Sequence, residues 1–460
     1  EIKETYSKKQ TGIKHKIEND SLSYFEEKIP FKLTNSQKNV INEIFKDMSN
    51  ESPMKRLLQG DVGSGKTIVA AAAVYASINS SHQTVLMAPT EVLAEQHFNS
   101  LNKILIFNGI QIHLLTSSVI DRDNIMQTIN DGTPALIIGT HALIQDKVKF
   151  NNLGLAIIDE QQRFGVEQRK KLTSDLKNTP HQLVMTATPI PRTTALAIYG
   201  DLDLSVIDEL PPGRKTINSI LHEGRKEDTD QIYKTCEKHL KNSSQIFVVC
   251  PFIEESEKLD IKAAENVYKQ YKEKFKKYKV EILHGKKSSD EKEKIMKDMN
   301  DKNIDILIST VVIEVGIDIQ NATLMIIESA ERFGLNQLHQ LRGRVGRGDK
   351  KSDCIFHITD GKNMETITDV GNKRLKAIVE HNDGFKLSEI DLQIRGEGKV
   401  TGTSQSGMSD LKIADIRYDY DILQSSKNYF ENNLTPQNQL LIEEEAKIFF
   451  PNFSKVEDST

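Results

Sequence analysis

The sequence predicts an α/β protein with two parallel β-sheets in tandem, followed by a helical segment. Ten short apolar runs recur along the chain, five in each half. The runs are continuous rather than alternating, which is typical of strands buried on both faces of a parallel sheet. Helical patterns separate the runs, so neighbouring runs form βαβ units. The length of 460 residues exceeds a single ordinary core, which also favours two or three domains.

The expected strands fall into two series that a linker separates. In the first half they are 56–59, 84–88, 135–140, 155–160 and 182–188, and in the second half 245–251, 280–285, 305–310, 323–329 and 354–359. Pro211, Pro212 and Gly213 interrupt any regular element, so we place the linker at 208–216. After about residue 361 the strand pattern fades, and helical stretches and a glycine-rich segment follow.

Composition narrows the class of protein. The net charge is −5, so any surface for nucleic acid must be local. No apolar stretch approaches the roughly 20 residues that span a membrane. Cys236, Cys250 and Cys354 lack metal-ligand spacing and are expected to be buried, reduced thiols of a cytoplasmic protein. The 12 histidines also form no zinc-ligand pattern.

A phosphate-binding loop is predicted at 60–67, where "GDVGSGKT" matches G-x-x-x-x-G-K-[ST]. Its glycines let backbone N–H groups curl round phosphate oxygens, and the helix N-terminus favours the anion. Lys66 would reach the β- and γ-phosphates, and Thr67 would bind Mg²⁺. The alternative is a chance glycine-rich turn, against which the strand–loop–helix context argues. The predicted contacts to ATP are Gly60, Asp61, Val62, Gly63, Ser64, Gly65, Lys66 and Thr67.

Two acids end the buried strand at 155–160. Downstream of a phosphate loop, an acid in this place is the expected ligand of Mg²⁺, and Asp159 takes that role through a water molecule. Glu160 can polarise a water in line with the γ-phosphate. The alternative is a pair of solvated acids at a strand end, which Lys66 in the same half makes the weaker interpretation.

Three arginines lie close together in "QLHQLRGRVGRG" (337–348): Arg342, Arg344 and Arg347. They suit a solvated loop or a nucleic-acid clamp, or one or two of them are arginine fingers that insert into the nucleotide held by the first half. The last interpretation places ATP in a cleft between the halves, which hydrolysis would open and close as in a motor.

A second stretch, "YKQYKEKFKKYK" (268–279), mixes aromatic residues with lysines. It suits nucleic-acid binding, but its aromatic residues are spaced 3, 4 and 3 apart, as on one face of a helix. We favour a stripe that faces the core, with the lysines solvated.

The motifs, in this order, resemble those of the superfamily 2 helicases. They are "FKLTNSQ" (31–37), "APTEVLAEQH" (88–97), "GTHALI" (139–144), "DEQQ" (159–162), "TATPIPRT" (186–193), "VVCPFIEESEKLD" (248–260), "STVVIEVGIDI" (309–319) and "QLRGRVGR" (340–347). The phrases "DEQQRFGVEQR" and "QLHQLRGRVGRG" resemble the RecG family of bacterial branched-DNA helicases. This resemblance covers about residues 30–425.

The resemblance implies roles for further residues. Gln37 would read adenine, Gly316 and Asp318 would contact the nucleotide, and Gln340 would join Lys66, Asp159, Glu160, Arg344 and Arg347 in catalysis. The implied DNA-binding or coupling residues are Thr90, Thr140, His141, Thr186, Thr188, Arg192, Thr310, Arg395 and Gln405. His141, His284 and His339 suit a contact with DNA or the ordering of a loop, and for each of them a structural hydrogen bond is an equally good interpretation.

The segment 381–407 resembles the TRG motif, which RecG shares with the transcription-repair coupling factor Mfd and which links ATP hydrolysis to movement along duplex DNA. A C-terminal cap on the second domain is the alternative. Two positions depart from the family pattern: Gln162 stands where RecG has His, and Glu397 replaces a Pro. Gln keeps hydrogen-bonding capacity without titrating near neutral pH, so we expect activity to survive.

The resemblance also implies the domain organisation. The expected parts are a linker-helix remnant (1–30), a RecA-like ATP-binding domain (31–207), the linker (208–216), a second RecA-like domain (217–360) and a TRG-like helical hairpin, loop and tail (361–460). Lysine-rich residues 8–18 resemble the family's linker helix, and the wedge domain that precedes it in the family is expected to be missing.

The expected activity is an ATP-hydrolysing DNA helicase that regresses stalled forks and migrates Holliday junctions. It implies ATP and Mg²⁺, branched double-stranded DNA and single-stranded-DNA-binding protein as partners, and a monomer at the bacterial nucleoid. One alternative is a truncated or partner-dependent, Mfd-like translocase that hydrolyses ATP without separating strands. Another is a DEAD-box RNA helicase, against which "DEQQ" and the TRG-like segment argue.

Overall fold

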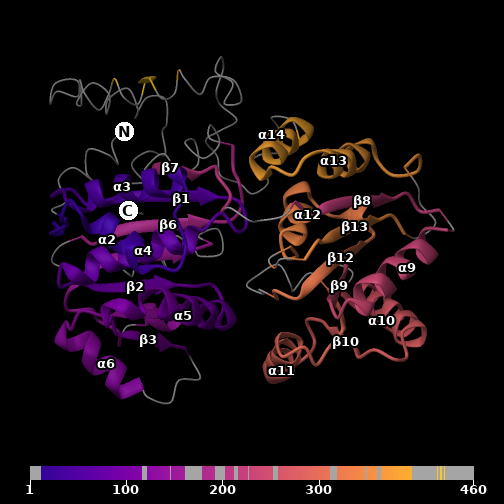
Figure 1. The fold of residues 1–460 in the computed structure, drawn as a ribbon, viewed down its shortest axis with the longest axis horizontal. Helices are drawn as coiled ribbons and strands as arrows, with labels where there is room; N and C mark the ends of the chain where they lie inside the picture. The colour runs from indigo at the N-terminus through magenta and orange to yellow at the C-terminus, as the bar shows by residue number, and fades with distance from the viewer. Residues whose placement is uncertain are drawn as a thin grey trace, which may run out of the picture.

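The computed structural model describes residues 12–116, 122–145, 147–160, 179–191, 202–211, 216–225, 227–251, 257–310, 319–346, 348, 350–359 and 364–395, with 422, 425, 426 and 429. These residues form two α/β units, each built on one parallel sheet (Figure 1). Within this part of the chain, no helix has the length and apolar character needed to cross a membrane.

The first sheet has seven strands in the order β3-β4-β2-β5-β6-β1-β7, all parallel. The strands are β1 (Lys55–Gly60), β2 (Gln83–Met87), β3 (Ile112–Leu115), β4 (Leu136–Gly139), β5 (Leu153–Asp159), β6 (His181–Thr186) and β7 (Asp203–Ile207). Its helices are α2 (Ser21–Lys28), α3 (Asn35–Met48), α4 (Lys66–Asn79), α5 (Glu91–Leu105) and α6 (Arg122–Asp131), with short 3-10 turns η1 (Ile106–Asn108) and η2 (His141–Ile144).

The second sheet has six strands in the order β10-β11-β9-β12-β13-β8, again all parallel. The strands are β8 (Asn218–His222), β9 (Gln245–Cys250), β10 (Val280–Leu283), β11 (Ile306–Thr310), β12 (Ala322–Glu328) and β13 (Asp353–His357). Its helices are α9 (Asp228–Lys241), α10 (Glu257–Lys274), α11 (Ser289–Asn300) and α12 (Leu335–Arg342), with η6 (Ala330–Arg332). A hairpin of α13 (Asp369–Glu380) and α14 (Gly384–Arg395) packs against α12.

Burial on both sheet faces explains the continuous apolar runs. In β2, Leu86 joins one core cluster of the first unit, whereas Val85 and Met87 join the cluster on the opposite face. In β9, Phe247 and Ile246 likewise face different clusters. Each central strand therefore needs apolar side chains on both faces. All ten predicted strands are present, so the predicted α/β class with two parallel sheets and a helical segment after them is confirmed.

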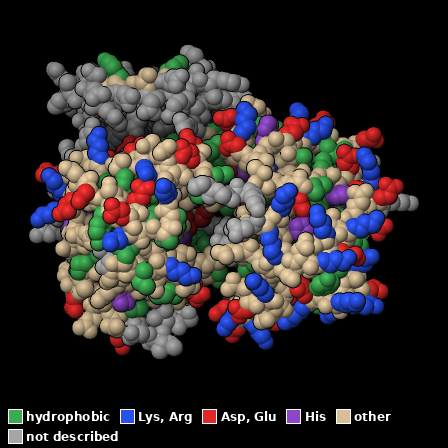
Figure 2. Space-filling model, viewed as in Figure 1, with side chains coloured by type: hydrophobic (Ala, Val, Ile, Leu, Met, Phe, Trp, Pro, Cys, Tyr) green, Lys and Arg blue, Asp and Glu red, His purple; other side chains and the backbone are tan. Residues whose placement is uncertain are grey.

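Two smaller predictions are also confirmed. The three cysteines are free and buried. Tyr271 and Phe275 of the aromatic stripe are almost fully buried in the core of the second unit. Lysines of the stretch, such as Lys269, Lys272 and Lys276, are exposed. Basic side chains (Lys and Arg), mixed with acids, cover the visible surface of this unit (Figure 2).

The expected linker helix is wrong for the described part of residues 8–18. Residues 12–18 form no helix, and Gly12 makes a parallel bridge with Thr179. The Gly12 N–H donates to the carbonyl oxygen of Glu51 at 2.7 Å. A Cβ at Gly12 would lie 2.6 Å from the backbone nitrogen of Pro53, so only glycine allows this close approach. Docking against the first unit therefore replaces helix formation here, and the helix α2 begins only at Ser21.

Candidate functional site

The phosphate loop joins β1 to α4 at the carboxyl edge of the first sheet. Gly63 and Gly65 have φ values of 76° and 92°, a left-handed conformation that favours glycine. A Cβ at Gly60 would lie 2.4 Å from Ser64 Oγ, so this glycine is also required. The loop ends at the N-terminus of the buried helix α4, where orphan N–H groups and the helix dipole attract an anion.

The side chains of the loop, and the neighbouring Gln37, also suit the binding of a phosphate group. Lys66 Nζ donates to the carbonyl oxygens of Gly60 at 2.7 Å and Asp61 at 3.0 Å. The buried hydroxyl of Ser64 has no hydrogen-bond partner among the described residues. A buried hydroxyl usually has a partner, and a bound phosphate oxygen would supply one. Gln37 Nε2 donates to the Ser64 carbonyl at 2.8 Å, and its Oε1 accepts from the Thr34 N–H at 3.0 Å. Gln37 thus supports the loop, and its predicted contact with adenine stays a prediction.

Asp159 and Glu160 lie at the end of β5, the strand between β2 and β6. Asp159 is buried, and its Oδ2 lies 2.7 Å from His97 Nε2 on α5. Glu160 has a φ of 52°, which is strained for a residue with a side chain. Its N–H donates to the Met185 carbonyl at 3.0 Å, and its Oε1 accepts from the Ala187 N–H at 3.2 Å. The two acids are therefore held by different elements of the first unit.

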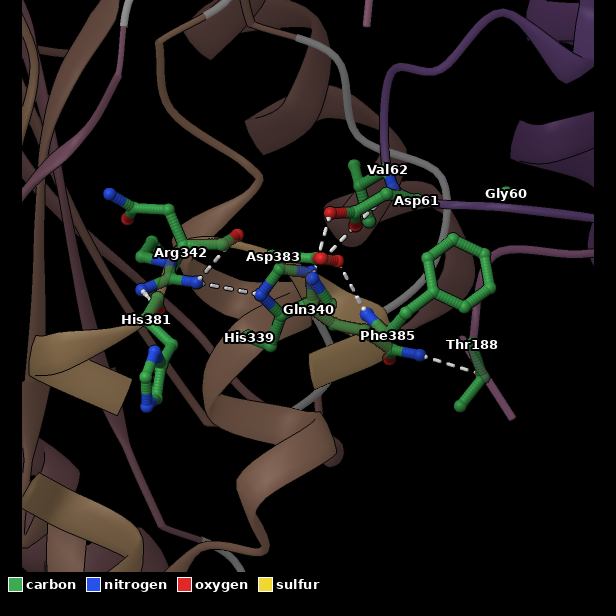
Figure 3. A network of polar contacts seen from close by, with 12 residues as sticks. Gly60, Asp61, Val62, Thr188, His339, Gln340, Arg342, His381, Asp383 and Phe385 are labelled. Atoms are coloured by element: carbon green, nitrogen blue, oxygen red, sulfur yellow. Dashed lines mark hydrogen bonds and ion pairs between the residues drawn. The ribbon is translucent and has the colours of Figure 1, made fainter. Parts of the chain in front are cut away.

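A helix of the second unit reaches the phosphate loop (Figure 3). His339 Nε2 on α12 lies 2.6 Å from Asp61 Oδ1. Arg342 Nη2 donates to His339 Nδ1 at 2.8 Å. Because a guanidinium only donates, Nδ1 must carry a lone pair and the imidazole proton must be on Nε2, facing Asp61.

The Asp61 carboxylate collects further donors. The Val62 N–H donates to Oδ1 at 2.6 Å, and the Gly384 N–H at the start of α14 donates to Oδ2 at 3.3 Å. Burial acts to raise the pKa of Asp61, but the hydrogen bonds from His339 and the Val62 N–H, together with the positive charge of Lys66, outweigh it, so the pKa lies below its ordinary value. Asp61 is thus the point where the phosphate loop, α12 and α14 meet.

Arg342 is an anchor within the second unit rather than a finger. It is 2% exposed, and its Nη1 donates to the carbonyl oxygens of Ile378 at 2.6 Å and His381 at 2.9 Å. Its Nη2 also reaches the Asn382 carbonyl at 3.2 Å. These carbonyls lie at the end of α13 and in the turn to α14, so Arg342 is bonded within the second unit, and the prediction that Arg344 and Arg347 act as fingers stays a prediction.

A second contact joins the units beside the first (Figure 3). Gln340 Nε2 donates to Thr188 Oγ1 at 2.8 Å, and the Thr188 N–H donates to Thr186 Oγ1 at 3.1 Å. A Cβ at Gly343 would lie 3.0 Å from Val62 Cβ, so α12 ends directly against the phosphate loop. The half-buried Arg344 follows Gly343 directly in the chain.

The remaining predicted residues are distributed as follows. Thr90 caps α5, Thr140 is buried before η2, His141 is exposed, Thr310 is buried at the end of β11, and Thr67 lies in the first turn of α4. Gln162, Arg192, Gly316, Asp318, Arg347, Glu397 and Gln405, and the side chain of Arg395, lie outside the described residues.

The sequence indicated no role for His97, and for His339 it left open a contact with DNA, the ordering of a loop or a structural hydrogen bond, but not the bond to Asp61. Both lie inside quoted motifs, and each is buried on a helix that follows a central strand. A buried histidine on such a helix needs a polar partner, so a histidine in an apolar helical pattern predicts a buried polar contact. The partner's identity, however, depends on three-dimensional packing.

Comparisons with known proteins agree with this architecture. The family described as DEAD/DEAH box helicase matches residues 34–196, and the helicase conserved C-terminal domain matches 228–349. The family described as ATP-dependent DNA helicase RecG, domain 3, C-terminal matches 381–457.

Curated relatives are similar along most of the chain. The ATP-dependent DNA helicase RecG of Aquifex aeolicus is 48% identical over 424 residues, covering 91% of this chain and 53% of the relative. That of Bacillus subtilis is 48% identical over 419 residues, covering 90% of this chain and 60% of the relative. The chain thus spans about half to three-fifths of the length of these relatives.

A solved structure of RecG bound to a three-way DNA junction has a similar fold. It superposes with a TM-score of 0.76 at 39% identity, covering 92% of this chain and 55% of that one. Sequence identity, the three matching families and this likeness extend across both sheets and the α13–α14 hairpin. The chain therefore belongs to the RecG helicase family.

Proposed function

We propose that this chain is an ATP-driven DNA motor that remodels branched duplex DNA, such as stalled forks and four-way junctions. The observation that carries the proposal is the contact of α12 with the phosphate loop, through His339 and Asp61. A nucleotide bound at this loop lies beside residues of both units, so hydrolysis of the nucleotide can change the position of one unit relative to the other. The relative bound to a three-way DNA junction supports branched DNA as the substrate.

The described residues fit the chemistry of ATP hydrolysis. When bound, Mg²⁺ would neutralise phosphate charge, and oxygen donors such as the Thr67 hydroxyl and Asp159 suit it. Lys66 would hold the β- and γ-phosphates, and the Glu160 carboxylate would orient the attacking water. Arg344 and Arg347, which belong to the second unit, would stabilise the negative charge of the transition state. Gln340 would hold α12 of the second unit to Thr188 of the first unit.

The remaining proposed contacts are to nucleotide and DNA. Gln37, Gly316 and Asp318 would contact the nucleotide. The residues proposed to grip DNA or couple to it are Thr90, Thr140, His141, Thr186, Arg192, Thr310, Arg395 and Gln405. Phosphate contacts from both units should make DNA binding weaken steeply with salt. We place the protein, as a monomer, at the nucleoid in the bacterial cytoplasm, with single-stranded-DNA-binding protein as a further partner.

The test is the Lys66→Ala variant. It should abolish DNA-stimulated ATP hydrolysis while binding to a forked duplex persists. Lys46→Ala, on the exposed face of α3, is the matched control and should hydrolyse ATP like the unmodified chain. Undiminished turnover by Lys66→Ala would overturn the assignment.

A second candidate is a duplex translocase that hydrolyses ATP without separating strands. The contact of Gly384 with Asp61 favours it, because it ties the phosphate loop directly to the hairpin that resembles the TRG motif. Forked and linear duplexes discriminate the two candidates. Equal stimulation of ATP hydrolysis by both, with no strand separation, supports the second, and strong stimulation by single-stranded RNA alone would exclude both.

A further inference from the structure

The contact between His97 and Asp159 belongs to neither the phosphate loop nor the second unit. His97 lies on the buried face of α5 with Leu93, Ala94 and Leu101. Its Nε2 lies 2.7 Å from Asp159 Oδ2, and both residues are less than a tenth exposed. An imidazole on an apolar helix face thus holds the acid at the end of β5, where the proposed function places a ligand of Mg²⁺.

The pair leaves one oxygen of Asp159 available. Among the described residues, Oδ2 meets His97, whereas Oδ1 accepts no hydrogen bond. A donor on one oxygen fixes the rotation of the carboxylate and directs the other oxygen. The neighbouring Glu160 is held differently, through the backbone N–H of Ala187. Of the two acids, His97 therefore contacts the aspartate.

The helix that carries His97 also carries a residue proposed to touch DNA. α5 follows β2, which pairs with β5, so this helix and Asp159 come from neighbouring strands. Thr90 caps α5 by accepting from the Leu93 N–H at 3.3 Å. His97 follows Thr90 by seven residues, which is about 10 Å along a helix axis. One rigid helix thus links the proposed DNA contact to Asp159.

We propose that His97 is a positioning residue, which orients Asp159 for Mg²⁺ and transmits the position of α5 to it when DNA binds. The inference rests on the proposed function and adds a route from DNA to the metal ligand. A purely structural pairing would stabilise the fold but would not alter the Mg²⁺ dependence of nucleotide binding.

The test compares His97→Phe, which keeps the ring without an N–H, with His97→Gln, which keeps a donor of similar reach. Binding of a fluorescent ADP analogue is measured with rising Mg²⁺ and in EDTA. In His97→Phe, the Mg²⁺ concentration for half-maximal effect should rise about 10- to 100-fold, the usual effect of removing a partner of a metal ligand. Binding in EDTA should stay unchanged, His97→Gln should restore the Mg²⁺ dependence, and Asn99→Ala on the exposed face of α5 should match the unmodified chain.

Stimulation of ATP hydrolysis by duplex DNA is the second readout, and it should fall in His97→Phe and recover in His97→Gln. A folded His97→Phe with ordinary Mg²⁺ dependence, or a His97→Gln as impaired as His97→Phe, would overturn the inference. His97→Leu replaces His97→Phe should the latter not fold. If the unmodified chain shows no DNA stimulation yet its Mg²⁺ dependence responds to His97, the role toward Mg²⁺ stands and the proposed motor function fails.

Discussion

His339 donates to Asp61 across 2.6 Å, and this bond connects the second unit to the phosphate loop. The proton lies on Nε2 because Arg342 occupies Nδ1. Arg342 also donates to the His381 carbonyl oxygen in the segment between α13 and α14. The Gly384 N–H, at the start of α14, donates back to Asp61. Two side chains, His339 and Arg342, thus connect the phosphate loop to the α13–α14 hairpin.

Replacing His339 by Leu should reduce DNA-stimulated ATP hydrolysis, because the substitution removes the bond that connects the phosphate loop, through α12, to the α13–α14 hairpin. Asp61→Asn should act through the same bond, so the double variant should be little worse than either single variant. A double-mutant cycle should give a coupling energy of about 0.5–3 kcal/mol. His381→Ala is the control, since the substitution keeps the backbone carbonyl that binds Arg342. Additive effects of the two substitutions would contradict the proposed connection.

Arg342→Lys should not preserve the hairpin, although it keeps the charge. A lysine cannot satisfy the three carbonyls and His339 that the planar guanidinium reaches, and each buried acceptor left without a donor costs about 1–3 kcal/mol. Amide hydrogen exchange over 369–395 should therefore accelerate. In the control Arg225→Lys, whose ion pair with Glu223 is exposed, exchange should stay unchanged. Slow exchange in Arg342→Lys would show that the hairpin is held by other contacts.

The protein should lose stability in mild acid because His15 of the N-terminal segment packs in a cluster with His82 and His181. Burial, together with the charge of neighbouring His181, lowers the pKa of His15 to about 3, and burial lowers the pKa of His181 to about 4. Unfolded histidines take up protons near pH 6.5, so the free energy of unfolding decreases as the pH falls below that value. The decrease ends below the folded-state pKa values.

The non-titrating variant His15→Gln tests this origin. Each histidine contributes at most about 1.4 kcal/mol per pH unit to the slope, so the variant should show a flatter dependence between pH 6.5 and 4. Denaturant unfolding at a series of pH values measures it. Parallel curves for the two chains would mean that His15 protonates equally in both states.

The sequence predicted the central strands and the largely buried edge strand β10, and it missed the other three edge strands. β3, β7 and β8 each lie at an edge and are only partly buried, so they lack the continuous apolar runs that mark central strands. The phosphate loop was predictable because its glycines and Lys66 are adjacent in the chain. The pairs His97–Asp159 and His339–Asp61 join residues 62 and 278 positions apart, and no local spacing encodes them.

Gly384 offers the sharpest test of how the units meet. A Cβ there would lie 2.5 Å from His339 Nε2, 2.7 Å from Pro189 Cγ and 3.1 Å from Asp61 Cγ, so an added methyl group would wedge apart the phosphate loop, the segment after β6 and α12. Overpacking of this kind costs about 1–3 kcal/mol, which corresponds to about a 5- to 150-fold loss of coupling.

Gly384→Ala should therefore lower DNA-stimulated ATP hydrolysis within that range, while nucleotide binding to the phosphate loop changes less. Gly285→Ala, where a Cβ meets no atom within 4 Å, is the matched control and should hydrolyse ATP normally. Because His339 lies nearest, His339→Ala in the Gly384→Ala background should restore space but not the bond to Asp61. Full DNA stimulation in Gly384→Ala would mean that the contact of Gly384 with the phosphate loop is not needed for ATP hydrolysis.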